Sequence, residues 1–298
     1  MRILITGATS KIGLDLLDRL LLEPCFSEIT LLTRSPQSAA LEKLRSSTQR
    51  VKIISADLRD PLLESHLLAE PSYDICLHMA GLTHTKVEAD YFQMNLHGTV
   101  RLAQILQKKN CRRFCLISSQ TAGENAGAYA LSKFQAEKEL LQMNWPELII
   151  LRPSEIVGAG SKEGLDRFFS LAQHYKIYPW LIRSFLNEKP IVFSPLPVQV
   201  LNRKILSILK APLTEKPPVI QILRGPEVTA GKLAWQLFRK CGALPLPIYL
   251  PLLGFVLKIF AWIGIQLIPP DQLPRLLGER MQKPVPSIQI EDCVLDAI

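Results

Sequence analysis

The segment Arg2-Ile-Leu-Ile-Thr6-Gly7-Ala-Thr-Ser-Lys11-Ile-Gly13 sets the architecture at the start of the chain. Its first part, Arg2 to Thr6, is an apolar run typical of a buried strand, and Leu14 to Leu22 has helical spacing. The two glycines let the backbone approach an anion at the helix N-terminus, where free N–H groups and the dipole favour negative charge. A strand, a phosphate-binding turn and a helix are therefore expected. A simple tight connection is the alternative, because Ser10 and Lys11 stand where dinucleotide-binding turns usually carry a middle glycine.

The same alternation of strands and helices continues through the first half of the chain. Further strands are expected at 28–33, 51–56, 74–79, 113–117 and 148–151, with helices at 39–45, 91–109 and 129–142. This order predicts an α/β fold with a Rossmann-like, doubly wound parallel sheet, whose ligands lie beyond the carboxyl ends of the strands.

Beyond Arg152 the alternation becomes patchy. Strands are expected at 191–193 and 219–223, and helices at 200–209 and 230–241. We therefore expect a dinucleotide-binding domain over 1–153 and a smaller substrate-binding lobe over 154–298, some of whose elements return to the main sheet.

Composition narrows the functional class. The chain is 48% hydrophobic and 21% charged, as in globular proteins. Its net charge of +8 is spread out, without a basic block interleaved with aromatics, which argues against nucleic-acid binding. The six cysteines fit neither a zinc site nor a disulfide framework, so no metal is expected. Free thiols and an N-terminus that reads as a core strand rather than a signal peptide predict a reducing, cytoplasmic location.

The stretch 248–268 is nearly all apolar, with Lys258 as its single charge. Its length would just span a bilayer, but a lysine at mid-span costs about 3 kcal/mol, and Pro251, Gly254 and Gly264 weaken a span further. A packed helix of the second lobe is favoured. A peripheral membrane contact or a lid over an apolar substrate is the next alternative, followed by a true span.

The end of the second strand bears on cofactor choice. An acidic residue there would bind a ribose 2′-hydroxyl, but Thr33-Arg34-Ser35 occupies the place. Arg34 can accept a 2′-phosphate, and Lys11 in the glycine turn could lie close to the same group. Both residues favour NADP over NAD, unless Arg34 is only a solvated loop charge.

Tyr129 and Lys133 stand four residues apart in an expected helix, so their side chains project from one face. A nearby ammonium favours the phenolate and lowers a tyrosine pKa from about 10. Such a pair could exchange a proton with an alcohol or carbonyl, although an ordinary helix can also carry these residues.

Taken together, the motifs make the chain resemble the extended short-chain dehydrogenase/reductase family, and within it the NAD-dependent epimerase/dehydratase group. The resemblance covers about residues 1–165 and rests on these elements in order: Thr6-Gly7…Gly13, Asp57-Leu58, His78-Met79-Ala80-Gly81, Asn95-Leu-His-Gly98-Thr99, Ser118-Ser119, Tyr129…Lys133 and Leu151-Arg152-Pro153…Gly158-Ala-Gly160.

The resemblance implies roles for individual residues. Tyr129 would be the acid/base, Lys133 would lower its pKa and bind the nicotinamide ribose, and Ser119, rather than Ser118, would bond the substrate oxygen. Asn95 would support the helix that carries the pair. A homodimer through a helix bundle is also implied. The cofactor-binding set would be Gly7, Thr9, Ser10, Lys11, Ile12, Gly13, Arg34, Asp57, Leu58, Met79, Ala80, Gly81, Asn95, Tyr129, Lys133 and Pro153.

The substrate is less well defined by the sequence. The resemblance implies epimerisation or keto reduction of a nucleotide-linked sugar. However, Glu155 stands near the place where sugar-nucleotide enzymes carry an asparagine facing the diphosphate, and Gln120-Thr121 replaces the acidic pair of dehydratases. The alternatives are a reductase of a hydrophobic alcohol or ketone, of 3β-hydroxysteroid dehydrogenase type, and a non-catalytic dinucleotide-binding subunit.

Overall fold

The structure is a computed structural model that describes residues 1–37, 41, 48–158, 164–182, 190–249, 252 and 288–292. The expected helix at 39–45 and the apolar stretch 248–268 fall mostly outside these residues, apart from 41, 248, 249 and 252. The predictions for these two segments are therefore neither supported nor contradicted by the fold.

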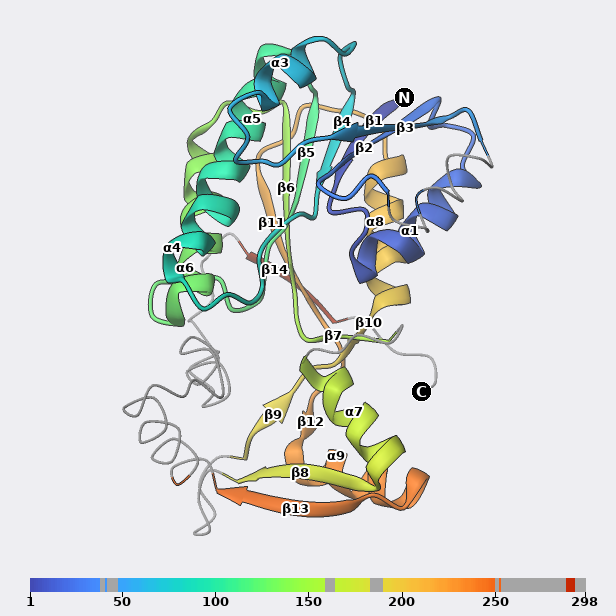
Figure 1. Cartoon of the computed structure of the whole chain (residues 1–298), viewed down its shortest axis with the longest axis vertical. Helices are drawn as coiled ribbons and strands as arrows, with labels where there is room; N and C mark the ends of the chain where they lie inside the picture. The colour runs from blue at the N-terminus through green and yellow to red at the C-terminus, as the bar shows by residue number, and fades with distance from the viewer. Residues whose placement is uncertain are drawn as a thin grey trace.

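A parallel sheet forms the centre of the molecule (Figure 1). Its order is β14-β11-β6-β5-β4-β1-β2-β3 among the described residues, and this arrangement confirms the α/β, Rossmann-like fold class. The chain runs outward from β1 on one side and then returns to β4 on the other, which places a topological switch point between these two strands. The strands are β1 (Arg2–Thr6), β2 (Glu28–Thr33), β3 (Val51–Ser55), β4 (Ile75–His78), β5 (Arg113–Ile117), β6 (Glu147–Pro153), β11 (Val219–Arg224) and β14 (Ile288–Asp292).

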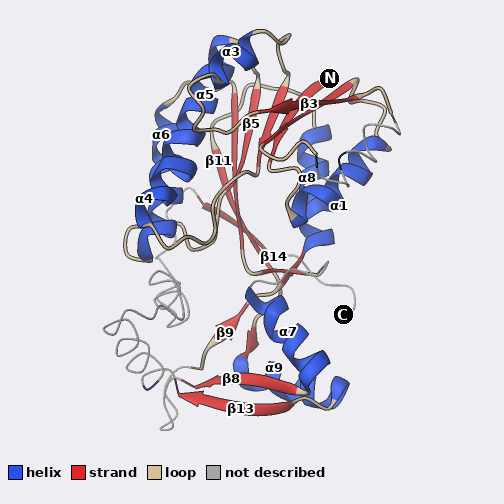
Figure 2. Ribbon diagram, viewed as in Figure 1, coloured by secondary structure: helices blue, strands red, loops and turns tan. Residues whose placement is uncertain are grey.

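Helices cover both faces of the sheet (Figure 2). One face carries α1 (Lys11–Leu21) and α8 (Val198–Lys210). The other carries α3 (Leu63–Leu68), α4 (Glu88–Tyr91), α5 (Thr99–Lys108) and α6 (Gly127–Gln142).

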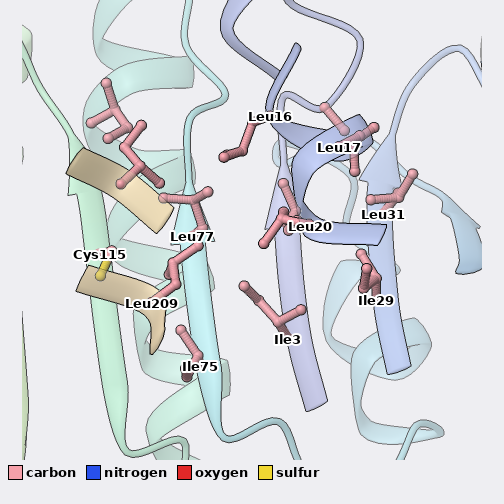
Figure 3. Close-up of a cluster of buried hydrophobic side chains, with 14 of the residues drawn as sticks. Ile3, Leu16, Leu17, Leu20, Ile29, Leu31, Ile75, Leu77, Cys115 and Leu209 are labelled. Atoms are coloured by element: carbon pink, nitrogen blue, oxygen red, sulfur yellow. The ribbon is translucent and has the colours of Figure 1, made fainter. Parts of the chain in front are cut away.

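Apolar side chains between the sheet and the first pair of helices form one of its buried cores. Leu16 and Leu20 of α1 and Leu209 of α8 belong to the same buried cluster as Ile3 and Leu77 of the sheet (Figure 3). All five side chains are completely buried. Removing this apolar surface from water fixes α1, and with it the glycine turn, against the sheet.

The expected continuous helix at 91–109 is wrong in detail. The chain forms α4, then the π-helix η1 (Phe92–Gly98), and only then α5. Within η1, the Asn95 side-chain amide forms hydrogen bonds with both the N–H and the carbonyl of Leu82. The Thr99 hydroxyl donates to the Asn95 backbone carbonyl at 2.7 Å. The Asn95 backbone carbonyl thus has a hydrogen-bond donor outside the regular α-helical pattern. Single-turn π-helices are frequent at functional sites.

The second half forms a smaller lobe with short sheets of its own. Its parallel pairs are β7 (Ile156–Val157) with β10 (Leu196–Pro197) and β8 (Ile177–Ile182) with β13 (Leu244–Tyr249), and β9 (Val192–Phe193) runs antiparallel to β12 (Val228–Thr229). Helices α7 (Gly164–Tyr175) and α9 (Ala230–Cys241) complete it. A separate apolar core includes Tyr178, Phe193 and Ala234. Strands β11 and β14 from this half pair with the main sheet beyond β6.

Three general features follow from the described residues. Cys25, Cys76, Cys111, Cys115 and Cys241 are free thiols. In this part of the chain no cluster of histidine, cysteine and acidic side chains could hold a metal ion. No helix in the same part is both long and apolar enough to cross a membrane.

Candidate active site

The glycine turn after β1 lies directly against the end of β4. Gly7 has a φ of +74°, and a Cβ on it would lie 2.6 Å from the backbone nitrogen of Ala80. Ser10 caps α1, because its hydroxyl accepts the Gly13 N–H at 3.2 Å. A Cβ on Gly13 would lie 2.4 Å from the Ala8 carbonyl oxygen, so neither glycine position admits a side chain. The turn leaves backbone N–H groups at a helix N-terminus, as phosphate binding requires.

A cavity of about 220 Å³ opens beyond the ends of β1, β2 and β4. It lies at the switch point of the sheet, where ligands of such folds bind. Of the residues expected to hold a dinucleotide, the cavity is lined by Gly7, Thr9, Ser10, Arg34, Leu58, Met79, Ala80 and Gly81.

Sequence reasoning missed some of the cavity wall. Apart from Met94 of η1, the additional lining residues are neighbours of the expected ones at the same strand ends, and extending each motif by one or two positions would have found most of them. They are Thr6, Leu32, Thr33, Ser35, Ala56, Leu82 and Met94.

Other residues expected at the cofactor do not line this cavity. Ile12 packs against the core, and Gly13 lies against the backbone of Ala8 in the turn. The remaining ones outside the lining are Asp57, Asn95, Tyr129, Lys133 and Pro153. For Lys11 the structure describes the backbone as the first residue of α1.

A small charged group stands where the adenosine side of a dinucleotide is expected. The Arg34 guanidinium lies 3.8 Å from a carboxylate oxygen of Asp57 and is 57% exposed. Arg59, which sequence reasoning missed, binds both oxygens of that carboxylate, at 3.0 and 2.9 Å. The hydrogen bond from Arg59 holds the pKa of Asp57 below its usual value. Because Arg59 satisfies Asp57, Arg34 has no short bond to that carboxylate and remains open to solvent.

Tyr129 and Lys133 project from the first turns of α6 into the interior. Tyr129 is 8% exposed, and its ring makes an edge contact with Tyr91 at a centroid distance of 5.8 Å. The Lys133 amine donates to the Ile117 carbonyl at 3.2 Å. Burial lowers the pKa of Lys133 to about 8, against an opposing effect of the Glu137 carboxylate.

The lysine also contacts the wall of the cavity. A Cβ on Gly81 would lie 3.0 Å from the Lys133 amine and 3.1 Å from the Asn95 amide oxygen. Gly81 lines the cavity, so the absence of a side chain there brings the lysine next to the space expected for the dinucleotide. The sequence-predicted turn and the Tyr–Lys helix are thus brought to one place.

The two serines after β5 have different surroundings. The Ser118 hydroxyl is buried and donates to the carboxylate of Glu137, which also forms an ion pair with Arg152. Ser119 is only partly buried, and its hydroxyl lies 2.9 Å from that of Thr121. The geometry therefore favours Ser119 over Ser118 as the hydroxyl that could meet a substrate.

The family of the chain follows from its sequence as a whole. Residues 3–196 match the NAD dependent epimerase/dehydratase family. The chain belongs to this family. The predicted resemblance is thereby confirmed.

The similar proteins differ in how much of their length matches this chain. The dTDP-glucose 4,6-dehydratase of Mycolicibacterium smegmatis is 27% identical over 42% of this chain and 38% of its own length. The chain thus spans well under half of that relative. Protein HTATIP2 of Rattus norvegicus is 24% identical over 70% of this chain and 81% of its own. The fold matches a UDP-glucuronic acid 4-epimerase from Bacillus cereus in complex with NAD, with a TM-score of 0.67 and 17% identity over 84% and 86% of the two chains.

One position of this epimerase/dehydratase member departs from the pattern expected for sugar nucleotides. Glu155 accepts the Ser194 N–H at 3.1 Å, and its own carbonyl accepts the Leu196 N–H at 2.8 Å. The neighbouring Ser154 hydroxyl donates to the Ser194 carbonyl. The 154–155 pair therefore ties the end of β6 to the segment leading into β10.

Proposed function

We propose that this epimerase/dehydratase family member is an enzyme that moves hydride at a carbinol or carbonyl carbon with an NAD(P) cofactor. The observation that carries the proposal is the contact at Gly81, which belongs to the cavity wall and adjoins the Lys133 amine. A dinucleotide in the cavity would then end beside a lysine and a tyrosine able to handle a proton.

The fit of the cofactor rests on the turn and on the cavity. Gly7 leaves no room for a side chain between the turn and Ala80, and the free N–H groups at the start of α1 suit a pyrophosphate. When bound, the nicotinamide takes or gives hydride at carbon. The residues expected to hold the dinucleotide are those at the cavity, with Lys133 at the ribose of the nicotinamide.

The protein's own part in the reaction is proton transfer and positioning. Tyr129 takes the proton from the substrate hydroxyl, or returns it to the carbonyl oxygen. Ser119 bonds the same oxygen. Lys133 stabilises the phenolate of Tyr129 by its positive charge, and Asn95 holds their helix. The low exposure of Tyr129 and Lys133 strengthens these electrostatic effects, because little water screens them.

NADP is the cofactor we favour. Arg34 lies at the end of β2, lines the cavity and is exposed, so a 2′-phosphate could reach it. Arg59 neutralises the neighbouring Asp57 carboxylate, which would otherwise repel the phosphate. NAD remains the alternative, and it is the cofactor bound in the similar epimerase structure.

For the substrate we favour a nucleotide-linked sugar, with epimerisation or 4-keto reduction as the reaction. The names of the relatives, a dTDP-glucose dehydratase and a UDP-glucuronic acid epimerase, support this class. Dehydration is disfavoured, because Gln120 and Thr121 cannot supply the acid and base for loss of water.

A reductase of a hydrophobic alcohol or ketone is the second candidate. It is favoured by Glu155, which stands in the sequence near the position where sugar-nucleotide enzymes carry an asparagine facing the diphosphate, and by the apolar composition of 248–268. A non-catalytic dinucleotide-binding subunit is the third, but such a protein has no chemical need for Ser119, Tyr129 and Lys133 together.

The test combines cofactor binding with product analysis. NADPH and NADH fluorescence is titrated with protein, and UDP- and dTDP-linked hexoses, their 4-keto forms and steroid ketones are then offered with each cofactor. Isomerised sugar without net change in absorbance at the nicotinamide band supports epimerisation, whereas stoichiometric NADPH oxidation supports reduction. Absence of any fluorescence change with both cofactors would refute dinucleotide binding.

Assembly, location and membrane contact stay predictions. A homodimer would be measured by light scattering of the purified protein, and a peripheral contact through 248–268 by sedimentation with lipid vesicles. A cytoplasmic location would be measured by fractionation of cells.

A further inference from the structure

His78, the last residue of β4, is completely buried and bonded at both ring nitrogens. Its Nδ1 lies 2.6 Å from the hydroxyl of Thr6, and its Nε2 lies 2.8 Å from the hydroxyl of Thr99. Thr6 and Thr99 are themselves at most 1% exposed. Through these three side chains, the carboxyl ends of β1 and β4 are linked to the start of α5.

Counting donors and acceptors fixes the direction of every bond in this chain. The Thr99 hydroxyl donates to the Asn95 carbonyl, which can only accept, so Thr99 must accept from His78. The proton of a neutral His78 ring is then on Nε2, and Nδ1 accepts from the Thr6 hydroxyl. The Thr6 oxygen in turn accepts the Ala80 N–H at 3.1 Å.

A charged imidazolium does not fit these surroundings. Both of its nitrogens would be donors, which leaves the Thr6 hydroxyl proton without its acceptor. Burial, together with the nearby charge of Lys133, lowers the pKa of His78 to about 3. The ring is therefore neutral throughout the physiological range, and it is not an acid or base of the reaction.

The chain of bonds continues to the Tyr–Lys helix. Asn95 donates to the Ser132 hydroxyl at 3.1 Å, and Ser132 donates to the Tyr129 carbonyl at 2.8 Å. At the other end, Thr6 precedes Gly7, and Ala80 is the residue against which Gly7 packs. The imidazole thus stands midway between the cofactor turn and the helix that carries the proton-transfer pair.

We propose that His78 is a positioning residue, which holds the phosphate-binding turn and the Tyr129–Lys133 helix in fixed relation through a single Nε2–H tautomer. The inference rests on the proposed dinucleotide-dependent function. The turn would hold the cofactor that exchanges the hydride with the substrate, and the helix carries the tyrosine that exchanges the proton, so the relative placement of these two elements sets the geometry of both transfers. Misplacement by about 1 Å can cost a reaction about 100-fold in rate.

The first test observes the tautomer directly. Protein labelled with ¹⁵N in its histidines is compared with His78→Leu, so that the signals lost in the variant identify His78 among the five histidines. We expect Nε2 to carry the proton and the signals to stay unchanged from pH 5 to pH 8. A proton on Nδ1, or titration of this ring within that range, would overturn the proposal.

The second test separates positioning from stability. His78→Leu leaves the buried Thr6 hydroxyl proton without its acceptor and removes the donor to the Thr99 oxygen, so it is expected to lower the melting temperature. The triple variant Thr6→Val, His78→Leu, Thr99→Val replaces the whole buried group by apolar side chains and is expected to recover much of that loss. We expect both variants to bind NADPH several-fold more weakly and to turn over about 10- to 100-fold more slowly on whichever probe sugar nucleotide or ketone the wild type accepts.

The two variants distinguish the possible outcomes. If the triple variant recovers turnover along with its melting temperature, His78 is only structural and the positioning role is wrong. If the wild-type protein binds neither NADPH nor NADH, the proposed function fails. In that case the ¹⁵N measurement on His78 still tests the direction of the hydrogen bonds to Thr6 and Thr99.

Discussion

The side-chain amide of Asn95 donates a hydrogen bond to the hydroxyl of Ser132 across 3.1 Å. The first residue lies in the π-helix η1, and the second lies in α6 directly before Lys133. The same amide accepts the Leu82 N–H at 2.7 Å and donates to the Leu82 carbonyl at 3.0 Å. One side chain therefore ties together the π-helix, the loop after β4 and the helix that bears the Tyr–Lys pair.

Replacing Asn95 by leucine is expected to remove all three bonds while keeping the same number of side-chain heavy atoms. The free energy of unfolding should fall by about 1–3 kcal/mol, because the partly buried Leu82 backbone groups lose their bonds to the buried Asn95 side chain. Ser132→Ala is the matched control, since it removes the bond between the helices and the Ser132 bond to the Tyr129 carbonyl but keeps both bonds to Leu82. Urea unfolding measures both. Equal stability of Asn95→Leu and wild type would contradict the role given to this amide.

The depressed pKa of Lys133 predicts a characteristic dependence of stability on pH. Its pKa is about 8 in the folded protein and 10.5 in an ordinary lysine. Between these values the unfolded chain binds a proton that the folded protein does not, so the contribution of this group to the free energy of unfolding rises with pH. Below pH 8 both states are charged, and burial of the ammonium opposes folding in full.

The comparison of wild type with Lys133→Met isolates that contribution. We expect the variant to be the more stable of the two at pH 7, by at most about 3 kcal/mol, and the difference to shrink towards pH 10.5. Lys138→Met, on an exposed face of the same helix, should show no such change with pH. Urea midpoints at several pH values measure it, and a constant difference for Lys133→Met would mean that the amine is not desolvated.

The two neighbouring serines should differ sharply. Ser119→Ala is expected to lower turnover by about 100-fold with little change in stability, because among the described residues the Ser119 hydroxyl bonds only the hydroxyl and the backbone N–H of Thr121. Ser118→Ala is expected to cost about 1–2 kcal/mol of stability, because it removes a donor to the buried Glu137. Melting temperature and turnover are measured on both. The reverse pattern would assign the substrate contact to Ser118.

Cofactor selection is expected to depend on Arg34. Arg34→Ala should weaken NADPH binding by about tenfold, because a charge-assisted bond to the 2′-phosphate is lost, while NADH binding serves as the internal control. Arg59→Ala should act in the same direction more weakly, since Asp57 would then compete for Arg34. Fluorescence titration gives both affinities. An unchanged ratio in Arg34→Ala would remove the argument for NADP.

Much of the fold could be predicted from sequence because strands that are buried on both faces of the sheet are rich in apolar residues. Strands such as β2 and β5 are mostly apolar and almost entirely buried, and their observed bounds equal the expected ones. The helix around Tyr129 is equally plain from its spacing. The π-helix was missed because η1 is only seven residues long. Over so short a segment, the spacing of apolar residues does not distinguish the wider turn of a π-helix from that of an α-helix.

The chemistry of individual side chains was harder to predict. Whether Ser118 or Ser119 faces the open side depends on which of them meets Glu137, a residue that becomes its neighbour only through the sheet and α6. The pairing of Asp57 with Arg59 depends on the turn after β3. The neutral state of His78 depends on two threonines that are far from it in the chain. These are properties of three-dimensional contact, which a linear pattern does not carry.

The most direct measurement follows deuterium from the cofactor to the substrate. NADPH or NADH deuterated at C4 of the nicotinamide is incubated with wild type or Tyr129→Phe and with a 4-keto sugar nucleotide, and the product is examined by mass spectrometry and NMR. We predict deuterium at the new carbinol carbon with the wild type, and loss of transfer in Tyr129→Phe despite nearly unchanged cofactor affinity. Undiminished transfer in that variant would contradict the proposed role of the Tyr129–Lys133 pair.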